Sequence, residues 1–402
     1  KKSVTITNEL FSNAIEMANI PRLNKLSGSC EIVGVAESDS IGKVPNKSPL
    51  ALHSEATHNA CIDAGISITD IDAFFTAGWS SLDVAEYIGI KPRFTDSTSV
   101  GGSSFVIHIA HAIAAISAGY CEVALITHGQ SGRSDRSPIP RNPGMPMVQY
   151  EYPYGIIGPP ISYAMACNRY MYKYGENRTR DAMAKIAVST RKWANLNPRA
   201  YFHKVPMSFD DYHESKWVSF PFHLLDCCLV TDAGAAVIVT SSERAKDMRK
   251  QGIKILGAAE GHDHSMISQM PDLTRAFGTK TGPQALAMAG VKHSDFDLAM
   301  IYDSFTYTVL ISLENLGFCN AGEGPDFLID HQTIPGGDFP LNTNGGGLSY
   351  THPGMYGIFT VVEAVRQLRG EGSDRQIENC NLALAHGTGG LLSSTGTLVL
   401  GK

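Results

Sequence analysis

Four side chains that can move protons follow predicted strands or glycine-rich turns in this chain of 402 residues. Tyr302 ends the apolar run LAMIY, and His386 ends the run NLALAH. Tyr350 and His352 lie two residues apart in NTNGGGLSYTHPG, residues 342–354. Phenols and imidazoles both serve as general acids or bases, so the set predicts proton-transfer chemistry. The alternative is a set of packing and turn residues, which is common for a tyrosine at a strand end or a His-Gly turn.

Backbone donors and one candidate nucleophile lie beside two other glycine-rich turns. Gly102 and Ser103 lie in VGGSSF, where a helix is predicted to begin, and Gly387 lies in HGTGG after the last predicted strand of the core. Backbone N–H groups in such places can stabilise a developing negative charge. Ser103 is either a nucleophile or, as is more usual at a helix start, a cap.

Composition excludes several classes of protein. The chain is 43% apolar and 18% charged, which is typical of a globular protein, and its net charge of -6 gives no basic field for nucleic acid. No apolar run reaches the roughly 18 residues that a membrane span needs, and the first residues lack the apolar core of a signal peptide. We therefore expect a cytoplasmic protein with no membrane span and no nucleic-acid partner.

The eight cysteines are scattered, and none forms the CxxC pair that begins many zinc sites. We expect buried free thiols and no bound metal. Cys227 and Cys228 are adjacent, so a redox role is the alternative for that pair.

The sequence contains two similar copies of the elements that position these residues. IVGVAE at 32–37 resembles ILGAAE at 255–260, and ACIDAGISITDIDAFF at 60–75 resembles ALAMAGVKHSDFDLAM at 285–300. In the segments 60–75 and 285–300, a helix is predicted to end at Ala-Gly, and an apolar strand follows after a short turn. The segment that contains VGGSSF likewise corresponds to the segment that contains NTNGGGLSYTHPG. A duplication of two similar halves is therefore predicted.

Each half is predicted to be a β-α-β-α-β unit with a mainly parallel sheet, because its strands are short continuous apolar runs. Two such halves can pack their helices together as an α/β body of five layers, αβαβα. We expect an extension at 1–29 with a peripheral helix near FSNAIEMA, an N-terminal half at 30–245 and a C-terminal half at 246–402. The Pro- and Tyr-rich segment at about 130–225 is predicted to be an inserted loop subdomain that covers the site. The site itself is expected beyond the carboxyl ends of the strands.

The motifs resemble those of the thiolase-like superfamily over nearly the whole chain. Counting back from the end of its helix, Gly102 occupies the place of the thiolase nucleophilic cysteine. YDSF resembles the Asn-Glu-Ala-Phe or His-Asp-Cys-Phe motif, so Tyr302 takes the Asn or His place. YTHPG resembles Gly-His-Pro through His352, and AHGTGG resembles Cys-x-Gly, with His386 in the cysteine's place. STRKWANLNPRAYF and DCCLVTDAGAAVIVTS are similar to the sterol carrier protein branch. The resemblance implies the duplicated five-layer fold, a homodimer and a coenzyme A thioester as substrate.

Within that superfamily, the loss of the cysteine resembles the bacterial steroid side-chain-cleaving aldolases. Those enzymes use two tyrosines, and Tyr302 and Tyr350 match their places. The resemblance implies retro-aldol cleavage of a 3-hydroxyacyl-CoA to a ketone or aldehyde and a shorter acyl-CoA. Gly102 would then leave room for a branched α-carbon, His386 would orient the thioester, and N–H groups near Ser103 and Gly387 would meet its oxygen. The alternatives are an acyl-CoA acyltransferase with an atypical site and a non-catalytic acyl-CoA or lipid binder.

The resemblance also bears on cofactors and partners. No covalently bound cofactor is implied, because coenzyme A enters as part of the substrate. The coenzyme A tail needs cationic and aromatic contacts, for which Arg191 and Trp193 in the inserted segment are candidates. The similar aldolases work with a small OB-fold and zinc-ribbon subunit, so a partner chain of that kind, and with it a heterotetramer, is expected.

Overall fold

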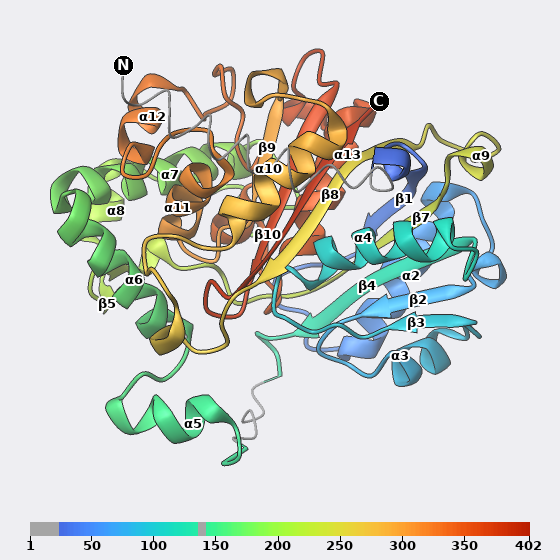
Figure 1. Ribbon diagram of the computed structural model, residues 1–402, viewed down its shortest axis with the longest axis horizontal. Helices are drawn as coiled ribbons and strands as arrows, with labels where there is room; N and C mark the ends of the chain where they lie inside the picture. The colour runs from blue at the N-terminus through green and yellow to red at the C-terminus, as the bar shows by residue number, and fades with distance from the viewer. Residues whose placement is uncertain (1–23, 136–141) are drawn as a thin grey trace.

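A computed structural model describes residues 24–135 and 142–402 (Figure 1). The expected helix near FSNAIEMA lies outside the described residues. The strands are β1 Cys30–Glu37, β2 Ala73–Thr76, β3 Phe94–Asp96, β4 Val123–Ser131, β5 Trp217–Ser219, β6 Phe222–His223, β7 Asp232–Ser241, β8 Ile253–His262, β9 Leu298–Ile301, β10 Leu382–Gly389 and β11 Ser394–Gly401. The α-helices are α2 Pro49–Ala64, α3 Ser81–Ile88, α4 Ser104–Ser117, α5 Pro146–Tyr150, α6 Pro159–Tyr174, α7 Glu176–Asn195, α8 Phe209–Glu214, α9 Ser242–Ala245, α10 Gly278–Ala289, α11 Thr306–Leu316, α12 Gly324–Asp330 and α13 Gly357–Arg369.

The strand order confirms the duplication. In the large sheet of the described residues, the order is β3-β2-β4-β7-β1 in the first half and then β8-β11-β10-β9 in the second. Reversing the second half superposes first strand on first strand and last on last. The sheets of the two halves join through the pairs Glu31–Lys254 and Ile32–Ile253 of β1 and β8. The sequence repeat at 32–37 and 255–260 therefore lies at the seam between the two halves.

The expectation of a mainly parallel sheet is wrong. β2 pairs in parallel with β3 and β4, and β9 pairs in parallel with β10. β7 and β11, the last strands of each half, instead lie antiparallel to both of their neighbours. Their apolar runs are continuous because helices cover both faces of the sheet, and that burial does not depend on strand direction. Continuous apolar runs alone thus do not report direction.

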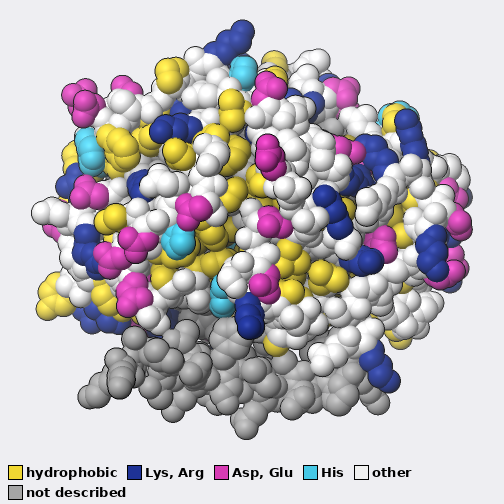
Figure 2. Space-filling model, turned by 90° about the horizontal axis from the view of Figure 1, so that it is seen from above, with side chains coloured by type: hydrophobic (Ala, Val, Ile, Leu, Met, Phe, Trp, Pro, Cys, Tyr) yellow, Lys and Arg dark blue, Asp and Glu magenta, His cyan; other side chains and the backbone are white. Residues whose placement is uncertain are grey.

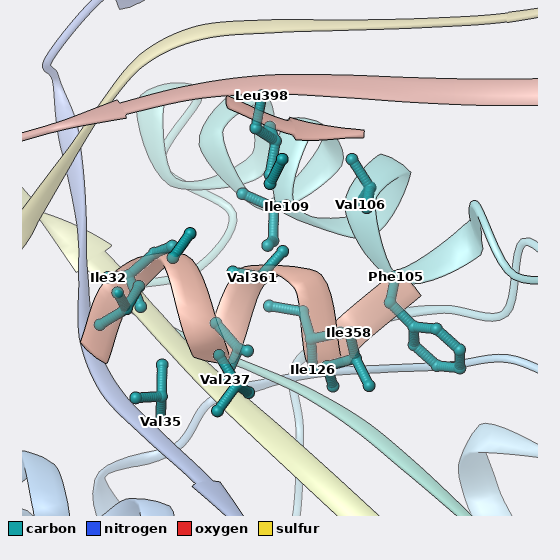
Figure 3. Packing of buried hydrophobic residues seen from close by; sticks show 14 of the residues in the cluster. Ile32, Val35, Phe105, Val106, Ile109, Ile126, Val237, Ile358, Val361 and Leu398 are labelled. Carbon is teal, nitrogen blue, oxygen red and sulfur yellow. The ribbon is translucent and has the colours of Figure 1, made fainter. Parts of the chain in front are cut away.

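Two helices, α4 and α13, form the central layer between the half-sheets and contact strands of both halves. The outer layers are α2 and α3 on the first half and α10 and α11 on the second (Figure 1). This arrangement is the predicted five-layer αβαβα body. Figure 3 shows the central packing, in which fully apolar side chains from both helices meet those of the sheets: Ile32, Val35, Phe105, Val106, Ile109, Ile126, Val237, Ile358, Val361 and Leu398.

The inserted segment consists of helices α5 to α8 and the β5–β6 hairpin. Helix α7 contacts α11, α12 and the π-helical turn Gly346–Tyr350, so it packs against the second half. Helix α5 stands apart from the sheet at the lower edge of the molecule (Figure 1). The segment thus links the two halves over one end of the sheet.

The surface mixes charges of both signs. Figure 2 shows Lys, Arg, Asp and Glu side chains interspersed with hydrophobic patches on the face seen from above. Among the described residues, no helix combines the length and the apolar character that crossing a membrane requires.

Candidate active site

Tyr302 and His352 form a buried hydrogen-bonded pair. Tyr302 directly follows β9, and His352 follows the π-helical turn Gly346–Tyr350. The hydroxyl oxygen of Tyr302 lies 2.7 Å from Nε2 of His352. Burial raises the pKa of Tyr302 well above its usual range and lowers the pKa of His352 to about 4. Both groups are therefore neutral at neutral pH, and a proton can pass between them along an existing hydrogen bond.

The ring of Tyr302 fills the space next to Gly102. A Cβ atom at position 102 would lie 1.8 Å from Cε1 of Tyr302 and 2.7 Å from its Cζ. The expectation that Gly102 leaves room for a branched substrate carbon is therefore wrong. The absent side chain makes room for the tyrosine ring, and any side chain at position 102 would displace it.

Gly346 and Gly347 of NTNGGGLSYTHPG fold around a carboxylate. Asp303 accepts backbone hydrogen bonds from Gly347 at 2.6 Å and Leu348 at 3.2 Å, and burial raises the pKa of Asp303 to about 7. A Cβ at Gly346 would lie 2.0 Å from Oδ2 of Asp303, so glycine alone fits there. Asp303 directly follows Tyr302 in the chain. Its hydrogen bonds to Gly347 and Leu348 therefore hold the glycine-rich loop in a fixed position relative to Tyr302.

Two further hydrogen bonds hold the turn that carries His352. His128, at the end region of β4 in the first half, has its Nε2 atom 2.7 Å from the carbonyl oxygen of Pro353. The backbone N–H of His352 donates to Oγ1 of Thr231 at 2.8 Å. Both halves of the duplication thus position the imidazole.

The pair opens into a cavity of about 480 Å³, which we call the reaction cavity. The inserted segment covers it as predicted, through Pro159, Tyr163 and Leu224. Three lining features were not predicted. Cys227 and Cys228 line the cavity, as does Thr388, whose buried Oγ1 has no hydrogen-bond partner in the described part of the chain. The duplication could have indicated Thr388, because it lies two residues beyond His386 at the end of the matching strand.

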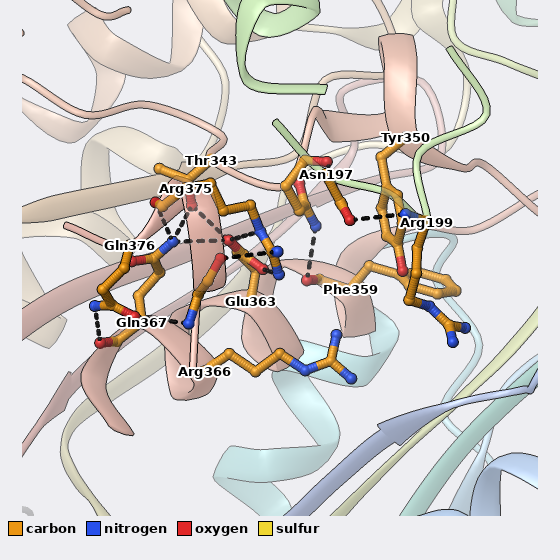
Figure 4. A network of polar contacts seen from close by, with 12 residues as sticks. Asn197, Arg199, Thr343, Tyr350, Phe359, Glu363, Arg366, Gln367, Arg375 and Gln376 are labelled. Carbon is orange, nitrogen blue, oxygen red and sulfur yellow. Dashed lines mark hydrogen bonds and ion pairs between the residues drawn. The ribbon is translucent and has the colours of Figure 1, made fainter. Parts of the chain in front are cut away.

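Tyr350 does not line this cavity. Its hydroxyl donates to Oε1 of Glu37 at 2.7 Å, and Arg366 donates to the same carboxylate. Figure 4 shows Tyr350 beside Arg199 at one side of a polar network, and a second buried ion pair, Glu363 with Arg375, at the other side. The expectation that the two tyrosines meet at one site is therefore not met. The π-helical turn ends at Tyr350 and the next residue, Thr351, is extended, so the side chains of Tyr350 and His352 point in different directions.

His386 lies on the opposite face of its strand from the Tyr302 side. Its Nδ1 atom lies 2.9 Å from Oγ1 of Thr397, and a Cβ at Gly278 of α10 would lie 3.6 Å from its ring. Burial lowers the pKa of His386 to about 3. Successive strand residues face opposite ways, so position 387 faces the central layer instead. The placement of His386 beside the thioester is thus not supported.

Ser103 and Gly387 pack against each other in the interior. A Cβ at Gly387 would lie 3.0 Å from Cα of Ser103, and the Ser103 hydroxyl lies 2.8 Å from Oγ of Ser394. Neither residue lines the reaction cavity, whereas Gly101, Gly102, Gly389 and Gly390 do. The glycines that line the cavity therefore lie one to three residues from the predicted donors, and the nucleophile alternative for Ser103 has no support.

Arg191 and Trp193 are buried parts of α7, so their predicted contact with coenzyme A is wrong. Arg191 donates to Oγ of Ser349 at 2.8 Å, and burial lowers the pKa of Arg191 to about 10. Nε1 of Trp193 donates to the carbonyl oxygen of Thr333 at 2.8 Å. Both side chains attach the inserted segment to the second half, which explains their aromatic and cationic character without a ligand.

Two curated proteins that are similar in sequence are named as a carboxyl-CoA lyase and as an aldolase. The chain is 36% identical to the 17-hydroxy-3-oxo-4-pregnene-20-carboxyl-CoA lyase of Mycobacterium tuberculosis, over 86% of this chain and 92% of that one. It is 34% identical to the steroid side-chain-cleaving aldolase of Thermomonospora curvata, over 94% and 99% of the two chains. A family described as "Thiolase C-terminal domain-like" matches residues 259–402.

Solved structures agree in fold. The "Ltp2-ChsH2(DUF35) aldolase" superposes with a TM-score of 0.85 at 32% identity, covering 94% of this chain and 98% of that one. Human mitochondrial 3-ketoacyl-CoA thiolase superposes with a TM-score of 0.66 at 16% identity, covering 94% of this chain and 99% of that one, and shows the fold alone.

Proposed function

This chain belongs to the thiolase superfamily, in the branch of steroid side-chain-cleaving aldolases, and from that membership we propose how its site cleaves a carbon–carbon bond. The chain is an acyl-CoA lyase that acts by retro-aldol chemistry on a 3-hydroxyacyl-CoA. The products are a ketone or aldehyde and a shorter acyl-CoA. The observation that carries the mechanism is the Tyr302–His352 hydrogen bond, formed in the space beside Gly102.

The pair can serve as both base and acid. The substrate hydroxyl gives its proton to the oxygen of Tyr302 while the phenol proton moves to Nε2 of His352. The C–C bond breaks, its electron pair passes to the α-carbon as an enolate, and a carbonyl forms at the former hydroxyl carbon. The proton then returns through Tyr302 to the α-carbon, so the pair ends in its starting state. General acid–base catalysis of this kind contributes about 10²- to 10⁴-fold.

Thr388 is the group we assign to the enolate oxygen. Its hydroxyl is buried and has no partner among the described residues, and Thr388 is one of the residues that line the reaction cavity. An unpaired buried hydroxyl is unfavourable, and a substrate oxygen that accepts its hydrogen bond removes that penalty. Donors aimed at a developing oxyanion typically contribute about 3 kcal/mol to lowering the barrier.

The cavity does not favour thiolase chemistry. Position 102 has no side chain and no space for one while Tyr302 stays in place. Cys227 and Cys228 line the cavity, but burial raises the pKa of the Cys227 thiol to about 12 and also raises the pKa of Cys228. Because the thiolate is the nucleophile, neither cysteine is activated for acyl transfer at neutral pH.

Tyr302→Phe tests the mechanism directly. The variant keeps the ring that fills the space beside Gly102 and loses only the hydroxyl. With 17-hydroxy-3-oxo-4-pregnene-20-carboxyl-CoA, whose hydroxyl is β to the thioester, we expect kcat to fall about 10²-fold or more and KM to change little. Release of the 17-ketone and propionyl-CoA is measured by chromatography. Wild-type turnover in Tyr302→Phe would refute the proposed role.

Thr388→Val and Thr388→Ser form a matched pair for the oxyanion. Valine keeps the shape of threonine without the hydroxyl, and serine keeps the hydroxyl. We expect Thr388→Val to lower kcat about 100-fold and Thr388→Ser to retain most activity. Equal rates in the two variants would remove Thr388 from the mechanism.

We also propose the assembly that the relatives suggest. The similar structure is a complex whose title includes a DUF35 component, which supports a small OB-fold and zinc-ribbon subunit as partner of this chain. We propose a cytoplasmic homodimer that binds two such subunits, with coenzyme A present only as part of the substrate. Light scattering of the co-expressed proteins tests it, and a mass of one chain alone would contradict it.

A further inference from the structure

Tyr163 lines the reaction cavity, but the proposed mechanism does not use it. It comes from α6 of the inserted segment, and only 3% of it is exposed. Its hydroxyl donates to the carbonyl oxygen of Gly390 at 3.1 Å and accepts the backbone N–H of Leu392 at 3.4 Å. Burial raises the pKa of Tyr163 to about 12, so the phenol stays neutral and keeps the single proton that it can donate. Both bonds are directed at the protein backbone.

These bonds hold a strained turn. The turn Gly390–Ser393 joins β10 to β11, and we call it the β10–β11 turn. Leu392 has a φ of 61°, a left-handed conformation that a bulky side chain rarely adopts, and its side chain is buried. Such a conformation persists only where the surrounding contacts fix it. Tyr163 supplies two of these contacts, and Thr388 lies two residues before the turn.

The ring of Tyr163 contacts the other side of the reaction cavity. Its centre lies 4.8 Å from the ring centre of Phe305, which comes three residues after Tyr302. Phe305 is itself stacked on Phe222, with ring centres 4.9 Å apart and an angle of 11° between the planes. One side chain therefore connects the segment that carries Tyr302 with the turn that follows Thr388.

We propose that Tyr163 is a positioning residue, which holds the β10–β11 turn so that the Thr388 hydroxyl faces the enolate oxygen at a fixed distance from Tyr302. The inference rests on the proposed function for the role of Thr388. Tyr163 itself transfers no proton, because its own proton is bonded to the carbonyl oxygen of Gly390. An oxyanion donor lowers the barrier only when it is already in place, so a loosened turn should lower kcat and leave KM nearly unchanged.

Amide hydrogen exchange tests the hold on the turn without any substrate. Tyr163→Phe keeps the ring that packs on Phe305 and removes only the hydroxyl. The peptide that spans residues 388–394 should then exchange at least about tenfold faster than in the wild type. The matched control is Tyr170→Phe, a buried tyrosine on the same helix whose hydroxyl donates to Glu314 and does not line the reaction cavity. It should leave exchange of that peptide unchanged, and unchanged exchange in Tyr163→Phe would overturn the inference.

A kinetic cycle with Thr388→Val distinguishes positioning from a general loss of structure. With 17-hydroxy-3-oxo-4-pregnene-20-carboxyl-CoA, Tyr163→Phe should lower kcat about tenfold and change KM little, whereas Tyr170→Phe should retain kcat. In the Thr388→Val background, Tyr163→Phe should lower kcat by less than about twofold, because no hydroxyl remains to be positioned. An equal fall in both backgrounds would overturn the inference. Faster exchange in Tyr163→Phe, without cleavage of the acyl-CoA by the wild type, would support the hold on the turn and contradict the proposed function alone.

Discussion

Adding one methyl group at Gly102 should disable the site by moving Tyr302. The Cβ atom of Gly102→Ala would lie 1.8 Å from Cε1 of Tyr302, far inside van der Waals contact. The ring is nearly fully buried and its hydroxyl is bonded to His352 at 2.7 Å. The ring must therefore shift, and a shift of more than a few tenths of an ångström breaks that hydrogen bond.

The magnitudes follow from the contacts. Overpacking a well-filled interior costs about 1–3 kcal/mol of stability. Loss of the Tyr302–His352 bond adds about 1 kcal/mol, and loss of proton transfer lowers kcat about 10²- to 10⁴-fold. Tyr302→Ala removes the obstructing ring and costs about 3–5 kcal/mol by itself. In that background Gly102→Ala should cost almost nothing, so the two changes are coupled by about 2–4 kcal/mol.

Urea unfolding of the two single variants and the double variant measures this coupling, and steady-state kinetics gives kcat. The matched control is Gly132→Ala, where the new Cβ would meet no atom closer than 3.4 Å. Additive stabilities, or wild-type turnover in Gly102→Ala, would show that the tyrosine ring does not occupy the space beside position 102.

Three other predictions concern Tyr350, Glu37 and His352. Tyr350→Phe should lower the free energy of unfolding by about 1–3 kcal/mol in urea titration, because the Tyr350 hydroxyl bonds Glu37. The variant should retain turnover, because this bond lies outside the reaction cavity. Loss of turnover in a stable variant would show that Tyr350 takes part in the mechanism. Burial alone raises the pKa of Glu37, but Arg366 outweighs burial and holds that pKa at about 2. The ionised Glu37 therefore contributes about 3 kcal/mol to the free energy of unfolding above pH 4.5, and this contribution is lost as the pH falls toward 2. Glu37→Gln should flatten this acid limb in thermal melts; an unchanged limb would contradict the assignment. Because the pKa of His352 is about 4, kcat should fall below about pH 5, and an acid limb near pH 7 would contradict a neutral imidazole.

The repeat made the architecture predictable because both halves carry the same order of strands, helices and glycine stops. Tyr302 and His352 were predictable for a related reason. Each follows a core element at the same end of the sheet, so the fold alone brings them together. Strand direction was less accessible, because an apolar run records burial and not which way the neighbouring strand runs.

The predictions for His386, Tyr350 and Arg191 were wrong because the sequence does not show in which direction each side chain points. In a strand, a shift of one residue moves a side chain to the other face, which is why His386 meets Thr397 and α10 while its neighbour faces the central layer. Tyr350 is two residues from His352, but a π-helical turn ends between them, and that irregularity has no sequence signal apart from the glycines. Arg191 lies on a helix that is buried on several sides, which a pattern of charges does not reveal.

The loss of a nucleophile and the gain of a proton-transfer pair are a single structural change. The space beside position 102 can hold a side chain on residue 102 or the ring of Tyr302, but the contact of 1.8 Å shows that it cannot hold both. The motif resemblance puts the nucleophilic cysteine of thiolases at that position. Once glycine occupies it, the ring can reach His352, and the histidine that the motif shares with thiolases becomes the partner of a phenol. The reaction then needs no acyl-enzyme, because a bond beside the thioester breaks while the thioester itself stays intact.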